Sequence, residues 1–149
     1  MKYSEFLKTE LEEKRPCPFD TPKPEDIISQ NKTAYLTYAL APYAPDHLLV
    51  IPKRHVFKIL ELSHEERDDV DNLLNEGWHL LQRLGHRSVS YLVREGTESG
   101  RSVDHIHYHA IPDIRIGDLD HDGNTREIMT PEAVEQQLIR LNTALHARP

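Results

Sequence analysis

Three histidines at alternate positions, His105, His107 and His109, are the residues of this sequence best suited to chemistry. Successive side chains of an extended strand point to opposite faces, so these three imidazoles would share one face. Ile106 and Tyr108 would then point into a core. Imidazole transfers protons and attacks electrophiles near neutral pH, and it is also a zinc ligand. The pattern therefore predicts either a catalytic site or a metal site.

A glycine-containing loop over residues 95–102 leads directly into the histidine segment. Glycine lets a backbone approach a ligand closely, and amides in such a turn can cradle an anion. Arg101 adds a fixed positive charge and Ser102 a hydroxyl donor. A plain hairpin connection would explain the loop on its own, but beside three aligned histidines we interpret it as a phosphate-binding loop. One imidazole could then attack phosphorus while another assists the leaving group.

The elements that must position these residues follow from hydrophobic periodicity and from proline and glycine. A capping box at Ser63 and Glu66 begins the longest helix and Gly85 ends it. Thr130 and Pro131 begin the last helix. Helices are predicted over residues 4–14, 64–84 and 131–146, and strands over 34–40, 47–51, 88–94 and 103–111. Short turns between strands around one long helix indicate an α+β domain with an antiparallel sheet.

The composition restricts the class of protein further. A chain of 149 residues fits one domain, 1–149, with a real core. A net charge of −7 argues against a nucleic-acid binder, and no apolar run is long enough to span a membrane. The single cysteine, Cys17, excludes an internal disulfide, and the first residues lack the apolar stretch of a signal peptide. We therefore expect a soluble cytoplasmic protein with no membrane or nucleic-acid partner.

Two motifs resemble those of a known family. Residues 105–111 have the form His-φ-His-φ-His-φ-φ, and in residues 44–55 a proline and His47 precede a strand that ends in Ile-Pro-Lys-Arg-His. In this order, with the helix, strand and glycine loop between them, they resemble the histidine triad (HIT) family over residues 16–112. The resemblance implies a HIT-like fold: an antiparallel sheet of about five strands, a long central helix and a C-terminal helix, usually in a homodimer.

The resemblance also implies an activity. HIT enzymes cleave or transfer at the α-phosphorus of a nucleotide derivative, such as a dinucleoside polyphosphate or a nucleoside phosphoramidate. His107 would be the nucleophile and would form a nucleotidyl-histidine intermediate that water resolves. His109 would contact phosphate oxygens or the departing group, and His105 would orient its neighbours. The positions implied to contact substrate or phosphate are His47, Gly100, Arg101 and Ser102.

Three positions depart from the family pattern. Arg101 and Arg94 stand where glutamine and asparagine are common, so we expect a more cationic pocket. Ala39 falls at or near the position of a ribose-binding acid or amide, and alanine cannot bind ribose hydroxyls. These departures leave the base, sugar and leaving group open. They also motivate an alternative, a nucleotide-binding or regulatory module without catalysis.

A zinc-containing variant is the third interpretation. Some relatives hold structural zinc on a Cys-x-x-Cys pair, a strand histidine and the first triad histidine, and the pair here reads Cys-Pro-Phe-Asp. Carboxylate oxygen can replace one thiolate, but losing a thiolate more commonly means losing the site. We therefore expect no required cofactor and assign no residue as a metal ligand. The set that could still bind zinc is Cys17, Asp20, His47 and His105.

Overall fold

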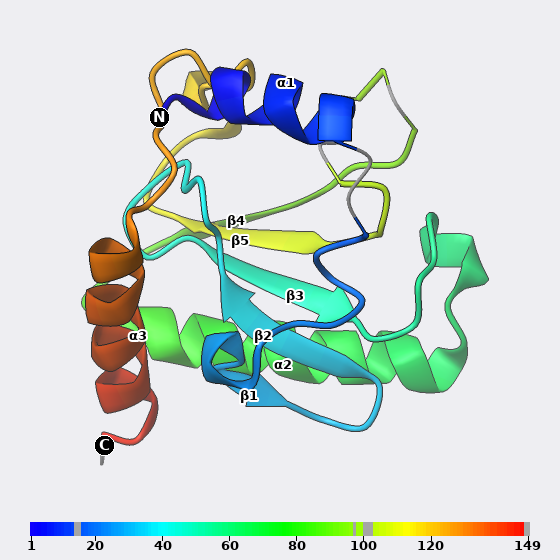
Figure 1. Ribbon diagram of the computed structural model, residues 1–149. Coiled ribbons are helices and arrows are strands. Elements are labelled where there is room, and N and C mark those ends of the chain that lie inside the picture. The colour runs from blue at the N-terminus through cyan, green and yellow to red at the C-terminus, as the bar shows by residue number, and fades with distance from the viewer. Residues whose placement is uncertain (14–15, 97, 100–102, 148–149) are drawn as a thin grey trace.

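Five strands form one antiparallel sheet in the computed structural model (Figure 1), which describes residues 1–13, 16–96, 98–99 and 103–147. The strands lie in the order β1-β2-β3-β5-β4, which confirms the predicted α+β fold. A short first strand was not predicted, because two residues are too few to show a pattern. The strands are β1 (Ser29–Gln30), β2 (Ala34–Tyr38), β3 (Leu48–Pro52), β4 (Val89–Val93) and β5 (Tyr108–Pro112).

The described part of the chain contains three α-helices, at the places that the sequence predicts. They are α1 (Tyr3–Glu13), α2 (His64–Arg83) and α3 (Pro131–Leu145), with single 3-10 turns at Pro24–Asp26, Ile59–Glu61 and Ile116–Asp118. Figure 1 shows α2 running along one side of the sheet and α3 standing at one end of both. None of the helices described here is long and apolar enough to cross a membrane.

The two faces of the sheet have different roles. Side chains alternate along β2 and β3, so Leu36, Leu48 and Val50 pack against α2 in the main core. Leu49 belongs to a second cluster, which Phe19 covers on the opposite face. The register pairs Leu49 with His109, and directly paired residues share a face. His109 therefore lies on the face of the sheet turned away from α2.

The strand predicted over residues 103–111 begins only at Tyr108, and this corrects the expectation of three histidines along one strand. The predicted pairing of its second half is confirmed, from Val93 with Tyr108 to Val89 with Pro112. Before Tyr108 the chain forms other contacts: the Ile106 amide donates to the Val56 carbonyl at 2.8 Å. Of the three histidines, only His109 lies in a strand.

Gly123 allows the start of α1 to dock on the segment before α3. Its φ is +72°, and a Cβ atom there would lie 2.9 Å from Cδ1 of Tyr3 and 3.1 Å from the Ser4 nitrogen. Gly123→Ala should therefore lower the free energy of unfolding by about 1–3 kcal/mol, because it adds backbone strain and a clash with backbone. Urea denaturation measures this. Gly117→Ala is the matched control, since a Cβ there meets nothing within 4 Å; equal midpoints for the two variants would contradict the prediction.

The capping box of α2 forms as predicted and gives the fold an acid-sensitive contact. Ser63 and Glu66 exchange side chain-to-backbone hydrogen bonds, and Arg54 donates to both carboxylate oxygens of Glu66 at 2.7 and 3.2 Å. The Arg54 guanidinium is the main reason that the pKa of Glu66 falls from 4.5 to about 2. A carboxylate whose pKa is depressed by folding stabilises the protein above its unfolded pKa, and this stability is lost as pH falls through the folded pKa.

We therefore expect the free energy of unfolding to decline between pH 4.5 and about pH 2 in part through Glu66. Glu66→Gln should flatten this decline and cost about 1–3 kcal/mol at neutral pH. Thermal unfolding across that pH range measures both effects. Glu65→Gln alters only an exposed pair with Lys32 and should change little; an unaltered pH dependence in Glu66→Gln would refute the assignment.

Candidate active site

A continuous row of imidazoles lies on the face of the sheet away from α2. The ring centroids of His107 and His109 are 4.9 Å apart, and those of His109 and His47 are 5.1 Å apart. His105 is fully buried, and the other three are at most 7% exposed. An aromatic ring lies at each end of the row. The ring centroid of Phe19 is 5.1 Å from that of His107, and the ring centroid of Tyr43 is 5.4 Å from that of His47. The row thus contains three of the four histidines that the sequence singled out, and the Phe19 ring also lies 6.0 Å from the ring of the fourth, His105.

The ring of His107 is oriented by the backbone of its own segment. Its Nδ1 lies 2.8 Å from the carbonyl oxygen of His105. A carbonyl can only accept a hydrogen bond, so Nδ1 carries the proton and donates it. In the neutral ring the lone pair is then on Nε2, which is the form that a nitrogen nucleophile needs. The irregular backbone before Tyr108 makes this contact.

The tautomers of His47 and His109 follow from their partners in the same way. The Tyr43 amide donates to Nδ1 of His47 at 3.1 Å, so the proton of neutral His47 is on Nε2. That nitrogen lies 2.9 Å from Nδ1 of His109, which must accept, and the proton of His109 is left on Nε2. Burial, reinforced by neighbouring positive charge, lowers the pKa of His47 to about 3 and lowers that of His109 as well. Both rings are neutral near pH 7.

Two guanidinium groups lie beside Tyr43, at the end of the row that His47 forms. The guanidinium carbon of Arg126 lies 3.9 Å from the centroid of the Tyr43 ring, and that of Arg94 lies 5.7 Å from it. Arg94 also donates to the Tyr43 hydroxyl at 3.0 Å and to Nδ1 of His121 at 2.9 Å. Arg94 therefore reaches Tyr43, the ring next to His47, and the more cationic pocket remains a prediction. Arg126 comes from the segment before α3 and carried no motif that would have identified it.

A second group of side chains lies at the other end of the row and could hold a metal ion. It contains Cys17, Asp20, His55 and His105, whose ligand atoms all lie within 4.8 Å of one another. Nε2 of His105 donates to the Pro52 carbonyl at 2.7 Å, and its Nδ1 faces the group, 3.0 Å from an oxygen of Asp20. Zinc would bind Nδ1 by displacing the proton that this nitrogen shares with the Asp20 carboxylate. That nitrogen is 3.5 Å from the Cys17 sulfur and 3.1 Å from Nδ1 of His55. Metal-binding histidines are typically oriented by such a second hydrogen bond, so the donor set fits zinc.

The structure corrects one member of the predicted zinc set. His47 does not join Cys17, Asp20 and His105, because both of its ring nitrogens are engaged by Tyr43 and His109. His55 takes the fourth place, with Nδ1 at 2.7 Å from an oxygen of Asp20. His55 was not predicted to have a role, although it is the last residue of the Ile-Pro-Lys-Arg-His motif.

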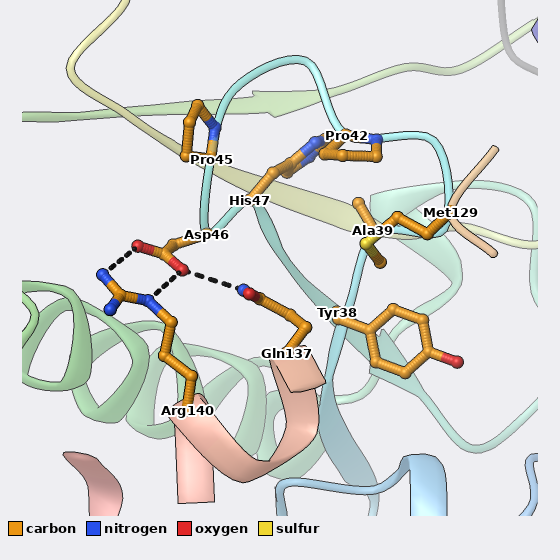
Figure 2. A pocket seen from close by; sticks show the side chains of 9 residues that line it. All are labelled: Tyr38, Ala39, Pro42, Pro45, Asp46, His47, Met129, Gln137 and Arg140. Carbon is orange, nitrogen blue, oxygen red and sulfur yellow. Dashed lines mark hydrogen bonds and ion pairs between the residues drawn. The ribbon is translucent and has the colours of Figure 1, made fainter. Parts of the chain in front are cut away.

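The phosphate-binding residues expected in the glycine loop, Gly100, Arg101 and Ser102, lie outside the described residues. Ala39 is described: it is 5% exposed and lines a cavity of about 270 Å³ that reaches His47 (Figure 2). The cavity lies between the end of β2, the turn before β3 and α3. Its other lining residues include Tyr38, Pro42, Met129 and Gln137.

Comparison with known proteins agrees with this fold and this row of histidines. The family model described as "HIT domain" matches residues 20–115, and the chain therefore belongs to the HIT family. An uncharacterised 16.1 kDa HIT-like protein from Mycoplasma pneumoniae is 33% identical over 91 residues, which are 60% of this chain and 63% of that protein.

A bis(5'-adenosyl)-triphosphatase from Saccharomyces cerevisiae is 30% identical over 103 residues, which are 66% of this chain and 50% of the yeast enzyme. The chain thus spans less than two thirds of the length of either curated relative. Among solved structures, a zinc-bound histidine triad family protein from Mycobacterium smegmatis superposes with a TM-score of 0.63 at 19% identity, covering 96% of this chain and 91% of that one. This likeness supports the fold.

Proposed function

We propose that this protein is a HIT-type nucleotidyl hydrolase or transferase that cleaves at the α-phosphorus of a nucleotide derivative. The observation that carries the proposal is the hydrogen bond from Nδ1 of His107 to the His105 carbonyl, which directs the lone pair to Nε2. The neutral, tautomerically ordered pair of His47 and His109 beside it supports the proposal. The yeast relative, named a bis(5'-adenosyl)-triphosphatase, supports a dinucleoside polyphosphate as the substrate class over a nucleoside phosphoramidate.

In the proposed reaction, Nε2 of His107 attacks the α-phosphorus and forms a P–N bond while the P–O bond to the departing phosphate breaks. The positive charge that develops on the ring of His107 is stabilised by the His105 carbonyl, which accepts a hydrogen bond from Nδ1–H while the proton stays on the ring. The proton on Nε2 of His109 would hydrogen-bond to a phosphate oxygen or to the departing group. Water then attacks phosphorus, the P–N bond breaks, and the nucleoside monophosphate leaves with loss of a proton to solvent.

This chemistry requires no metal at the reacting atoms. Zinc bound by Cys17, Asp20, His55 and His105 would act structurally, by tying the segment around Cys17 to His105 and so to the carbonyl that orients His107. Assembly as a homodimer and a cytoplasmic location remain predictions from the resemblance and the composition.

The proposal is tested by incubating the full chain with diadenosine triphosphate, diadenosine tetraphosphate and adenosine 5'-phosphoramidate. We expect AMP as a product, with the polyphosphates turned over faster. Mass spectrometry of acid-free quenched samples should detect an adenylyl adduct on His107. Binding of AMP without turnover of any of the three substrates would favour the non-catalytic module instead.

A further inference from the structure

The residue immediately before His47 has an unusual conformation and surroundings. Asp46 has φ +65°, a left-handed conformation that side chains other than glycine, asparagine and aspartate rarely adopt. It ends the turn in which the Tyr43 amide donates to the His47 ring. The conformation of Asp46 therefore decides how the His47 ring enters the site.

The carboxylate of Asp46 is buried and receives hydrogen bonds from three side chains. Gln137 donates at 2.9 Å, and Arg140 donates through two nitrogens at 3.1 and 3.2 Å (Figure 2). His86 contributes the shortest contact, from Nε2 at 2.6 Å. With its side chain only 4% exposed, Asp46 would be costly to bury without these donors.

His86 links Asp46 to a second strained aspartate. Its other nitrogen, Nδ1, lies 2.8 Å from a carboxylate oxygen of Asp113, whose φ is +57°. Asp46 and Asp113 are the two non-glycine residues with positive φ in the described part of the chain. Carboxylates only accept hydrogen bonds, so an imidazole between two of them must carry a proton on both nitrogens. His86 is thus an imidazolium, and with Arg140 it balances the two negative charges.

We propose that Asp46, held by His86, is a positioning residue that orients His47 and, through it, fixes the tautomer of His109. The connection runs from Asp113 to His86, then to Asp46, then along one peptide to His47, whose Nε2 donates to His109. Burial alone would lower the pKa of His86, but the bonds to both aspartates outweigh it and raise that pKa. The role in turnover rests on the proposed function, whereas the effect on the tautomer does not.

The test replaces His86 by glutamine, which is neutral and cannot donate to two carboxylates through one planar ring. In His86→Gln we expect kcat to fall on the order of tenfold or more with KM nearly unchanged, because a displaced catalytic ring costs rate rather than binding. Nitrogen NMR shifts of the imidazoles should show His109 as one tautomer in the wild type and as a mixture in the variant. Asp113→Asn, which leaves the contact between His86 and Asp46, should give a smaller change of the same kind.

His79→Gln is the matched control, because His79 is an exposed histidine of α2 outside this network. It should leave both kcat and the His109 signals unchanged. If His86→Gln keeps wild-type kcat and a single His109 tautomer while folded, the proposal is wrong. If the wild type turns over no nucleotide but His86→Gln still mixes the tautomers, positioning stands and the proposed function fails.

Discussion

Replacing His107 by alanine should reduce turnover on the order of a thousandfold or more and abolish the nucleotidyl-histidine adduct, because the attacking nitrogen is removed. The fold should survive, since His107 precedes β5 and its backbone takes part in none of the strand pairs that β5 makes with β3 and β4. The measurement is steady-state AMP release together with mass spectrometry of the quenched protein.

A second variant separates loss of the nucleophile from loss of folding. His107→Asn keeps a donor that can reach the His105 carbonyl, so it should remain folded and still lack turnover. His79→Ala, at an exposed position of α2, should behave as the wild type. Full activity in either His107 variant would end the proposal that this ring carries the chemistry.

Zinc should raise the unfolding temperature of the metal-stripped protein by roughly 5–10 °C when free zinc exceeds its dissociation constant about a hundredfold. The reason is that the ligand atoms of Cys17, Asp20, His55 and His105 already lie within 4.8 Å of one another. Burial raises the pKa of the Cys17 thiol, so zinc must displace a proton there, and the shift should shrink as pH falls. Calorimetry with and without zinc measures it.

The variant that identifies the site is His55→Ala, which should lose the zinc-dependent shift. Its control is His64→Ala, which removes an exposed histidine at the start of α2 and should keep the shift. A shift of equal size in both variants would mean that zinc binds elsewhere. If zinc does not shift the unfolding temperature of the wild type, then hydrogen bonds, and not zinc, hold the four side chains together.

Much of the fold could be predicted because its signals are local. The long helix is marked by the Ser63 capping box and by the glycine at position 85, and both act within a few residues of the chain. The two motifs around His47 and His107 are likewise contiguous. Family membership and the identity of the imidazoles in the row followed from these short stretches.

Other features depend on contacts between distant segments, and short sequence patterns do not record them. The strand expected from residue 103 begins only at Tyr108, because the Ile106 amide donates to Val56 in the loop after β3 and the His105 ring donates to Pro52 at the end of β3. His55 rather than His47 completes the possible zinc site for the same reason. The roles of His86 and Arg126 could not be predicted from short patterns, since His86 bonds to Asp46, 40 residues away, and Arg126 to the Ala41 carbonyl, 85 residues away.

The sequence by itself determined which side chains carry the chemistry and on which kind of fold, because spacing along a strand and caps along a helix are properties of neighbouring residues. Only the tertiary structure decided the protonation and orientation of each ring. A histidine has two nitrogens, and which one holds the proton depends on what each nitrogen faces. Nδ1 of His107 faces a carbonyl oxygen two residues away in the sequence. Nδ1 of His109 instead faces Nε2 of His47 at 2.9 Å, because β3 pairs with β5.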